Sequence, residues 1–465
     1  MRWEAIDLRF DARKDNGWTG RASLIGLETE TLRLGQAQLR GSGRIDRVAS
    51  RNGVGATLDF RAEGLALHDA ALQEALGPAL SGHAVLFWRK GEDALRLPQL
   101  SLTGEGFALS AGLRIEGLES GLNTGGRLSF TTTDLSRLSK LTDLPLAGSA
   151  EVTLEGEASR LSGSFDLALD MVANGLRTGF EQVDRLTGGT TRLTVSARRD
   201  EFGTVLRALN LAVDGLALSA SGQGSSGGSD LAGKLTLADL GILDPAWGGS
   251  LTAEARLTGT PADGTLTLSG TGNRLSVGQP KADRLIEGET ALEVALRLRD
   301  GRLFLSAAWL DGTNLAAEAT GTGTGDELAV SGRIRDLALL AEGYPGPVTL
   351  SGSLTPEAGG ASMDLRVLGP AGIDTRVAGR ISGADADLTV QGSADAALLN
   401  AVADPATLAG SLRLDLALRG PLALSSLSGR VTMAGGRIAY PFRGISLTRT
   451  ELVADLSQGS ARLAA

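Results

Sequence analysis

Hydrophobic residues alternate with polar or small residues in the stretch from Asp395 to Tyr440. Leucine occupies every second position from Leu412 to Leu418, and the positions between are Arg, Asp and Ala. Successive side chains of a β-strand point to opposite faces, so this pattern predicts a strand with one apolar and one polar face. Gly420-Pro421 predicts a turn, and Gly429 opens a further strand. The stretch therefore predicts a helix-strand-turn-strand unit.

The clearest hairpin signal lies between Leu292 and Leu305. The apolar positions Leu292, Val294, Leu296 and Leu298 alternate with Glu, Ala and Arg, and Leu303 and Leu305 resume the pattern. Asp300-Gly301 lies between the two runs, and an Asp-Gly pair at this place is typical of a tight hairpin turn. We expect two antiparallel strands joined at Asp300.

Short helical segments interrupt the alternation at irregular intervals. The period changes in residues 67–80 and again at 134–141. Further short helical segments begin at Asp239, Asp336 and Asp395, and Asp395 is a candidate N-cap. Fixed short repeats would indicate a solenoid, whereas these spacings fit a sheet that grows by a variable number of strands. The glycine-rich stretches 222–228 and 321–325 read as turns within this architecture.

The one-sided alternation requires that the apolar faces be hidden from water. Hydrophobic residues make up 42% of the chain but aromatic residues only 4%, and glycine accounts for 65 of 465 positions. Two packed sheets usually need bulky side chains between them. A half-open sheet can instead leave an apolar groove whose Leu, Val and Ala walls suit acyl chains. The alternative, that the leucine rows are ordinary core, stays open on the pattern alone.

The fold class that we predict is all-β, an elongated, twisted, half-open β-groove with a few short inserted helices. Residues 1–130 form its β-rich start, and residues 131–465 form a continuous repetitive groove. The predicted groove-lining residues are inward-facing apolar positions of the clearest strands: Leu251, Leu257, Leu292, Val294, Leu296, Leu298, Leu412, Leu414, Leu416 and Leu418.

Charge and composition disfavour several classes of partner and of binding site. The net charge is −9 with no basic run, which disfavours nucleic acid. Cysteine is absent, which excludes disulfides and thiolate metal sites. No apolar run is long enough for a membrane-spanning helix, and the N-terminus lacks the apolar region of a signal peptide. Both ends of the sequence resemble cuts through a longer repetitive protein.

Motifs that resemble catalytic signatures lack their required context. Residues 222–227 match G-x-G-x-x-G, but a turn and a strand follow where a dinucleotide site needs a helix. Residues 224–228 match G-x-S-x-G, yet His68 and His83 both precede the serine. Asp385 and Asp387 lack the rest of a calcium loop. We therefore expect a protein without catalytic activity, metal or cofactor.

The ordered series of these motifs resembles the TamB family and the wider AsmA-like group of bacterial envelope proteins. The shared plan is D-L-x-x-L, then Gly-Ser, a leucine-alternating strand, a glycine, and L-x-G. It is clearest at 420–438, at 440–447 and at 278–285 leading into the hairpin at 292–305. The resemblance covers residues 130–465 best.

The resemblance implies a protein that spans the periplasm of a Gram-negative envelope, anchored in the inner membrane by an N-terminal helix. It would shield phospholipid acyl chains between the two membranes, support outer-membrane protein assembly and secretion, and partner an outer-membrane barrel, TamA. This sequence lacks the anchor helix and a recognisable TamA-binding part. We therefore expect an internal fragment.

Two other classes compete with this interpretation. A secreted β-solenoid adhesin or structural surface protein also alternates, but it usually shows short fixed periods and asparagine ladders. An outer-membrane barrel would carry girdles of aromatic residues, which a content of 4% does not favour.

Overall fold

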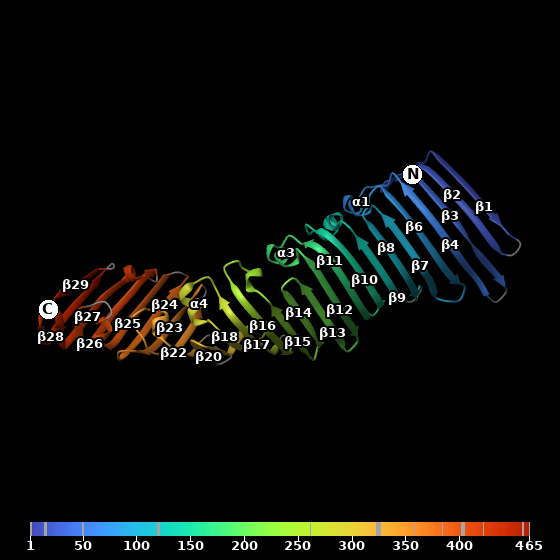
Figure 1. Cartoon of the computed structure of the whole chain (residues 1–465). Coiled ribbons are helices and arrows are strands. Elements are labelled where there is room, and N and C mark those ends of the chain that lie inside the picture. Colours follow the sequence, from blue (N-terminus) through green and yellow to red (C-terminus); the bar gives the residue numbers. More distant parts are fainter. Residues whose placement is uncertain are drawn as a thin grey trace. The chain divides into compact units, whose positions relative to one another are not determined.

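The computed structural model describes residues 2–13, 16–48, 51–118, 121–260, 262–321, 327–357, 359–383, 385–400, 405–421, 423–457 and 460–464. It divides into two compact units, Met1–Ala238 and Asp239–Ala465. Each unit is an antiparallel β-meander with short helices between some of its strands (Figure 1). The predicted all-β fold with an open sheet and a few inserted helices is confirmed.

The strands of the first unit are β1 (Ala5–Ala12), β2 (Gly17–Glu28), β3 (Leu32–Val48), β4 (Arg51–Glu63), β5 (Ala66–Leu67), β6 (Ala79–Arg89), β7 (Ala94–Gly104), β8 (Phe107–Glu116), β9 (Asn123–Thr132), β10 (Ala147–Ser159), β11 (Phe165–Arg177), β12 (Thr190–Asp200), β13 (Gly203–Val213), β14 (Leu216–Ser225) and β15 (Gly228–Leu237). Its helices are α1 (Ala70–Leu76), η1 (Leu135–Leu138), α2 (Ser139–Thr142) and α3 (Glu181–Thr187). Every strand pairs antiparallel with the next, except that β5 adds to β3 and β4 pairs with β6. The sequence boundary at residue 130 falls inside β9, which pairs with β8 and β10.

The strands of the second unit are β16 (Gly248–Gly259), β17 (Asp263–Ser276), β18 (Glu289–Arg299), β19 (Arg302–Gly312), β20 (Leu315–Gly321), β21 (Leu328–Ile334), β22 (Val348–Glu357), β23 (Gly360–Gly369), β24 (Ile373–Ser382), β25 (Asp385–Asp395), β26 (Thr407–Pro421), β27 (Leu427–Tyr440), β28 (Ile445–Ser457) and β29 (Ser460–Ala464). Its helices are η2 (Leu240–Ile242), α4 (Pro280–Leu285), η3 (Leu337–Leu339), η4 (Ala396–Leu399), η5 (Leu424–Ser426) and η6 (Pro441–Arg443). Each strand pairs antiparallel with its chain neighbour.

The helices collect at one margin of each sheet because a meander returns to the same side after every second strand. In the first unit α1, α2 and α3 lie at this margin, where Figure 1 shows α1 and α3 at the same ends of their strands. In the second unit η2, α4, η3, η4 and η6 do so. We call these strand ends the helical margin and the opposite ends the turn margin.

The predicted cap at Asp395 is confirmed, and the aspartates at the other three predicted helix starts cap their segments in the same way. The Asp134 carboxylate accepts a hydrogen bond from the Ser136 backbone N–H at 2.9 Å, and Asp239, Asp336 and Asp395 make the equivalent bond two residues on. A free N–H at the start of a helix needs such an acceptor. Most of these segments are single 3₁₀ turns, shorter than the predicted helices; the segment predicted at 67–80 is helical only at Ala70–Leu76. The sequence interpretation missed α3 and α4.

Two turn predictions are confirmed, whereas the turn predicted at Gly420-Pro421 is wrong, because both residues still belong to β26 and pair with Ala386 and Asp385 of β25. Asp300 and Gly301 join β18 to β19 with φ of 48° and 75°, as a tight hairpin turn requires. The glycine-rich stretch 222–228 forms the hairpin from β14 to β15, with a strand and not a helix after it. The stretch at 321–325 lies outside the described residues beyond Gly321.

Several glycines mark positions where two strands approach too closely for a side chain. At Gly222, φ is 147°, and a Cβ would stand 2.1 Å from the Asp230 carbonyl oxygen of the next strand. Gly352 repeats this geometry, with a φ of 156° and the Asp364 oxygen at 2.0 Å. Such backbone is essentially restricted to glycine. The high glycine content therefore serves the close approach of neighbouring strands as well as the turns.

We predict that Gly222→Ala lowers the free energy of unfolding by about 2 kcal/mol or more, because it adds both backbone strain and a steric clash. The matched control is Gly233→Ala on the paired strand β15, where the nearest atom to a new Cβ is 3.5 Å away. Urea denaturation of both variants measures the difference. Equal destabilisation by the two substitutions would contradict the role assigned to Gly222.

Candidate functional site

The candidate site is the apolar face of the sheet in the second unit, where cross-strand register aligns hydrophobic residues into continuous rows. Leu257 on β16 pairs with Leu266 on β17, Leu266 pairs with Leu296 on β18, and Leu296 pairs with Leu305 on β19. Directly paired residues of neighbouring strands point to the same face. The other predicted residues of β16 and β18 share this face: Leu251, Leu292, Val294 and Leu298.

The rows continue into the strands that the sequence marked most clearly. Leu416 on β26 pairs with Val390 on β25, and Leu418 pairs with Leu388. From Val390 the register leads back through Val377, Leu365 and Gly352 to Val330 on β21. From Val330 it passes through Ala319 to Ala308 and Val294. The structure thus brings every predicted lining residue onto one face.

The face is free of charge among the described residues of β16 to β27. Besides Leu, Val, Ile, Ala, Met and Gly it carries Pro356, Tyr440 at the end of β27, and two buried threonines, Thr290 and Thr375. Most of its large side chains are half-buried, and Leu292 is 41% exposed. A packed core would bury these side chains fully. The face is therefore only partly covered by the chain itself.

Leu412 differs from its neighbours on β26 because a helix covers it. It is 2% exposed and packs with Ala396 of η4 and Met433 of β27 in a small closed cluster at the helical margin. The first unit repeats this arrangement, where Leu135 of η1 packs on Ala150 and Ala173. The short helices thus close the apolar face along one margin, while Leu414, Leu416 and Leu418 stay half-buried beyond it.

The opposite face of the second unit is polar and carries ion pairs between neighbouring strands. Arg366 on β23 binds both carboxylate oxygens of Asp374 on β24, at 2.9 and 2.7 Å. Arg376 and Asp364 form the reciprocal pair. These hydrogen bonds hold the pKa of Asp364 and Asp374 below the ordinary aspartate value. The sheet thus has one solvated face.

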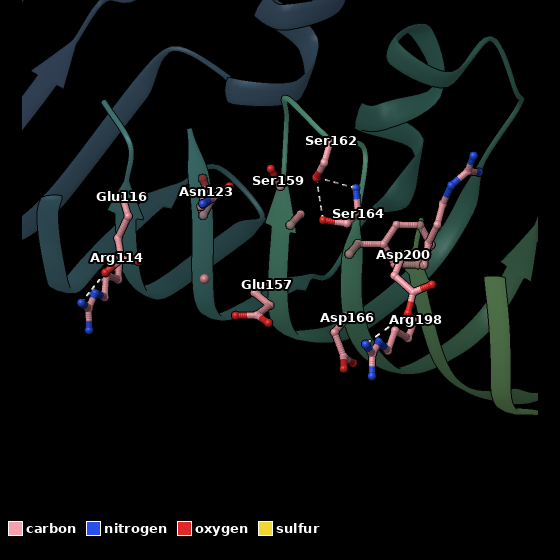
Figure 2. Close-up of a pocket in the computed structure, with 15 residues that line it drawn as sticks. Arg114, Glu116, Asn123, Glu157, Ser159, Ser162, Ser164, Asp166, Arg198 and Asp200 are labelled. Carbon is pink, nitrogen blue, oxygen red and sulfur yellow. Dashed lines mark hydrogen bonds and ion pairs between the residues drawn. The ribbon is translucent and has the colours of Figure 1, made fainter. Parts of the chain in front are cut away.

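Another hollow lies in the first unit, at the turn margin between β8 and β12 (Figure 2). Its volume is about 770 Å³, and it is lined by strand-end residues of both charges together with Ser162 and Ser164 of a turn. Ser162 and Ser164 hydrogen bond to each other at 2.7 Å, and Arg198 pairs with Asp200. Asp166 is held by Arg207, which lowers the pKa of its carboxyl group. Most of these polar groups therefore already satisfy one another, which leaves a solvated surface.

The residues considered for chemistry lie apart from one another. His83 on β6 pairs with Asp59 at 2.7 Å on the polar face of the first unit. Asp387 on β25 pairs with Arg419, in the second unit. Within the described residues no group of three or more His, Asp or Glu side chains is placed to hold a metal ion. No described helix has the length and apolar character needed to cross a membrane.

We predict that Leu412→Ala and Leu416→Ala differ in their effect on stability. Removing the buried Leu412 side chain leaves a cavity and costs about 3 kcal/mol, whereas Leu416 is already half-exposed and costs about 1 kcal/mol. Denaturant titration of the two variants measures these losses. Similar losses would mean that the face around Leu416 is packed like the cluster around Leu412.

We predict that the paired aspartates contribute to stability above the ordinary aspartate pKa of about 3.9. Because folding lowers their pKa, this contribution is lost as the pH falls from that value through their folded pKa. Carboxyl chemical shifts of Asp364 and Asp374 should show midpoints below about 3.9 in wild type. In Arg366→Gln and Arg376→Gln the midpoints should rise toward it; unchanged midpoints would contradict the pairing.

Comparisons with known proteins do not assign a role to this site. No family model, no curated protein and no solved structure matches the chain. The geometry of the apolar face is therefore the basis on which a function can be proposed.

Proposed function

We propose that the chain is a passive lipid carrier whose apolar face shields phospholipid acyl chains from water. The observation that carries this proposal is the continuous, charge-free row of half-buried Leu, Val and Ala side chains across the second unit. These side chains offer apolar area without groups that would hydrogen bond a polar ligand. An acyl chain gains about 0.8 kcal/mol for each CH₂ group removed from water, and it needs no other recognition.

The exposed area of the chain supports this proposal. The protein exposes 27813 Å² of surface, whereas a globular monomer of its mass exposes about 16,000 Å². A single-layer sheet gives this excess, because within each unit the described strands form one open sheet with no second sheet stacked on it. Leaving that face in water is unfavourable at about 25 cal/mol for each Å² of apolar area. Bound acyl chains would remove this penalty.

The mechanism that we propose breaks no bond. Acyl chains lie against the row formed by Leu257, Leu296 and their neighbours, and the half-open face lets them enter and move from strand to strand. The helical margin is closed by clusters such as that around Leu412, so lipid would occupy the remainder of the face. The polar face stays in water and keeps the carrier soluble through its ion pairs.

The cellular setting is proposed on the sequence resemblance to TamB and AsmA-like proteins. In that setting the chain is a segment of a periplasm-spanning protein anchored in the inner membrane. It would carry phospholipids between the two membranes and support outer-membrane protein assembly and secretion with a TamA-like barrel. The rival reading as a β-solenoid adhesin gains no support from the strands, which pair antiparallel between chain neighbours within each unit.

We predict that a photoreactive p-benzoylphenylalanine at Leu296 cross-links to phospholipid when the chain is produced in a Gram-negative periplasm. The matched control is the adjacent position Arg297, whose side chain points to the polar face and is exposed. Mass spectrometry of the adducts should show lipid at position 296 and several-fold less at 297. Equal yields, or no lipid at 296, would refute the proposed binding face.

We also predict that the double variant Val294→Asp with Leu296→Asp co-purifies with several-fold less phospholipid than wild type, because two carboxylates in the row oppose burial beside an acyl chain. Circular dichroism provides the folding check. Arg297→Asp, on the polar face of the same strand, should retain wild-type lipid. Unchanged lipid content in a folded double variant would count against the proposal.

A further inference from the structure

An exposed aromatic side chain lies on the polar face of the second unit, opposite the apolar rows. Trp309 on β19 is 44% exposed. The register leads from it through Glu318 on β20 and two serines to Arg366 on β23. Since directly paired residues point to the same face, the indole shares the face that carries the ion pairs of β23 and β24. It therefore has no part in the apolar face proposed to hold lipid.

Small side chains surround this indole on the neighbouring strands. The positions diagonal to it include Ala291 and Ala295 on β18 and Ala316 on β20. A methyl group at a diagonal position is too short to cover an indole ring, whereas an aromatic or long side chain could reach it. The ring of Trp309 therefore stands above its surroundings and is accessible from solvent.

Unpaired carboxylates flank the ring. Glu293 and Glu318 pair with Trp309 directly in the register, one on each side, and Asp311 lies two residues further along β19 on the same face. All three are exposed, and among the described residues none of them forms an ion pair. Because neighbouring strands lie about 4.8 Å apart, the two glutamates are on the order of 10 Å apart with the indole between them.

Other carboxylates of the same face are neutralised by arginines. Asp364 and Asp374 are held by the arginines of β23 and β24, and Asp455 is bound by Arg430 at 2.7 Å. The group formed by Trp309, Glu293, Glu318 and Asp311, which we call the Trp309 patch, differs because it joins an open aromatic ring to negative charge that no arginine offsets. A cation is attracted both by the face of an indole and by carboxylates beside it.

We propose that the Trp309 patch docks a basic segment of a partner protein. One lysine or arginine side chain lies over the indole, and further basic side chains pair with Glu293 and Glu318. Charge complementarity favours a segment with several basic residues over a single small cation, because carboxylates lie on both sides of the ring. The contact uses the polar face alone, so it does not depend on lipid occupancy of the apolar face.

Fluorine NMR of the full chain labelled with fluorotryptophan tests this contact at the ring itself. The probe is a hexalysine peptide, and Trp309→Phe and Trp247→Phe assign the two resonances. Addition of the peptide should shift the Trp309 resonance, and the shift should diminish as salt screens the charges. Trp247 is the matched control: it is 42% exposed but lies in the connection between η2 and β16. Its resonance should not move.

Fluorescence anisotropy of labelled hexalysine gives the affinity. Glu293→Gln combined with Glu318→Gln should weaken binding about tenfold, as two exposed ion pairs at about threefold each. Trp309→Leu should weaken it about threefold, whereas Trp309→Phe keeps an aromatic ring and most of the affinity. The charge-matched control is Glu287→Gln combined with Glu342→Gln, which removes two exposed carboxylates from connections at the helical margin. It should bind as wild type does, and circular dichroism checks the fold of each variant.

Three results would overturn the proposal. One is a Trp309 resonance that does not move, and another is an equal loss of affinity in the two double glutamate variants, which would mean attraction to net charge only. The third is a shift caused by choline chloride but not by hexalysine, which would assign the patch to a small cation. The double variant at Val294 and Leu296 should bind the peptide as wild type does, so this test is separate from that of the lipid proposal.

Discussion

The structure depends on one constraint: side chains of a strand alternate between faces, so an apolar row persists only if the register between neighbouring strands is kept. A shift of one residue would turn the whole apolar set of a strand to the solvent. The meander keeps the register because short turns join consecutive strands. Where an extra residue enters β19, beside Ala295 and Leu296, the pairing shifts and the apolar rows continue on the same face as Leu305 and Ala308. That continuity gives the second unit its charge-free face.

This constraint also explains how little of the face is packed as core. The rings that normally fill a core are scarce, and the buried clusters among the described residues are small, such as those beneath η1 and η4. Glycines such as Gly222 and Gly352 allow close approach of neighbouring strands but contribute no apolar area. The fold thus holds its strands by backbone hydrogen bonds, cross-strand side-chain pairs and ion pairs of the polar face. Its apolar face stays available for a ligand.

Much of this architecture could be predicted from the sequence because its signals are local. The leucine alternation of β26, the Asp300-Gly301 turn and the aspartate caps each depend on neighbouring residues. The burial of Leu412 could not be predicted from the alternation in its own strand, because the residues that cover it belong to η4 and not to that strand. Pro280 at the first turn of α4 was an available signal that was missed, whereas α3 lacks a side-chain cap at Phe180.

The central claim is that the apolar face holds acyl chains, and native mass spectrometry of the full chain released from a Gram-negative envelope without detergent tests it most directly. The account predicts a monomer that carries phospholipid adducts, which the cross-strand rows around Leu296 and Leu416 retain in water. A monomeric chain that is folded, soluble and free of lipid would contradict it, because the apolar face would then be stable in water without an occupant.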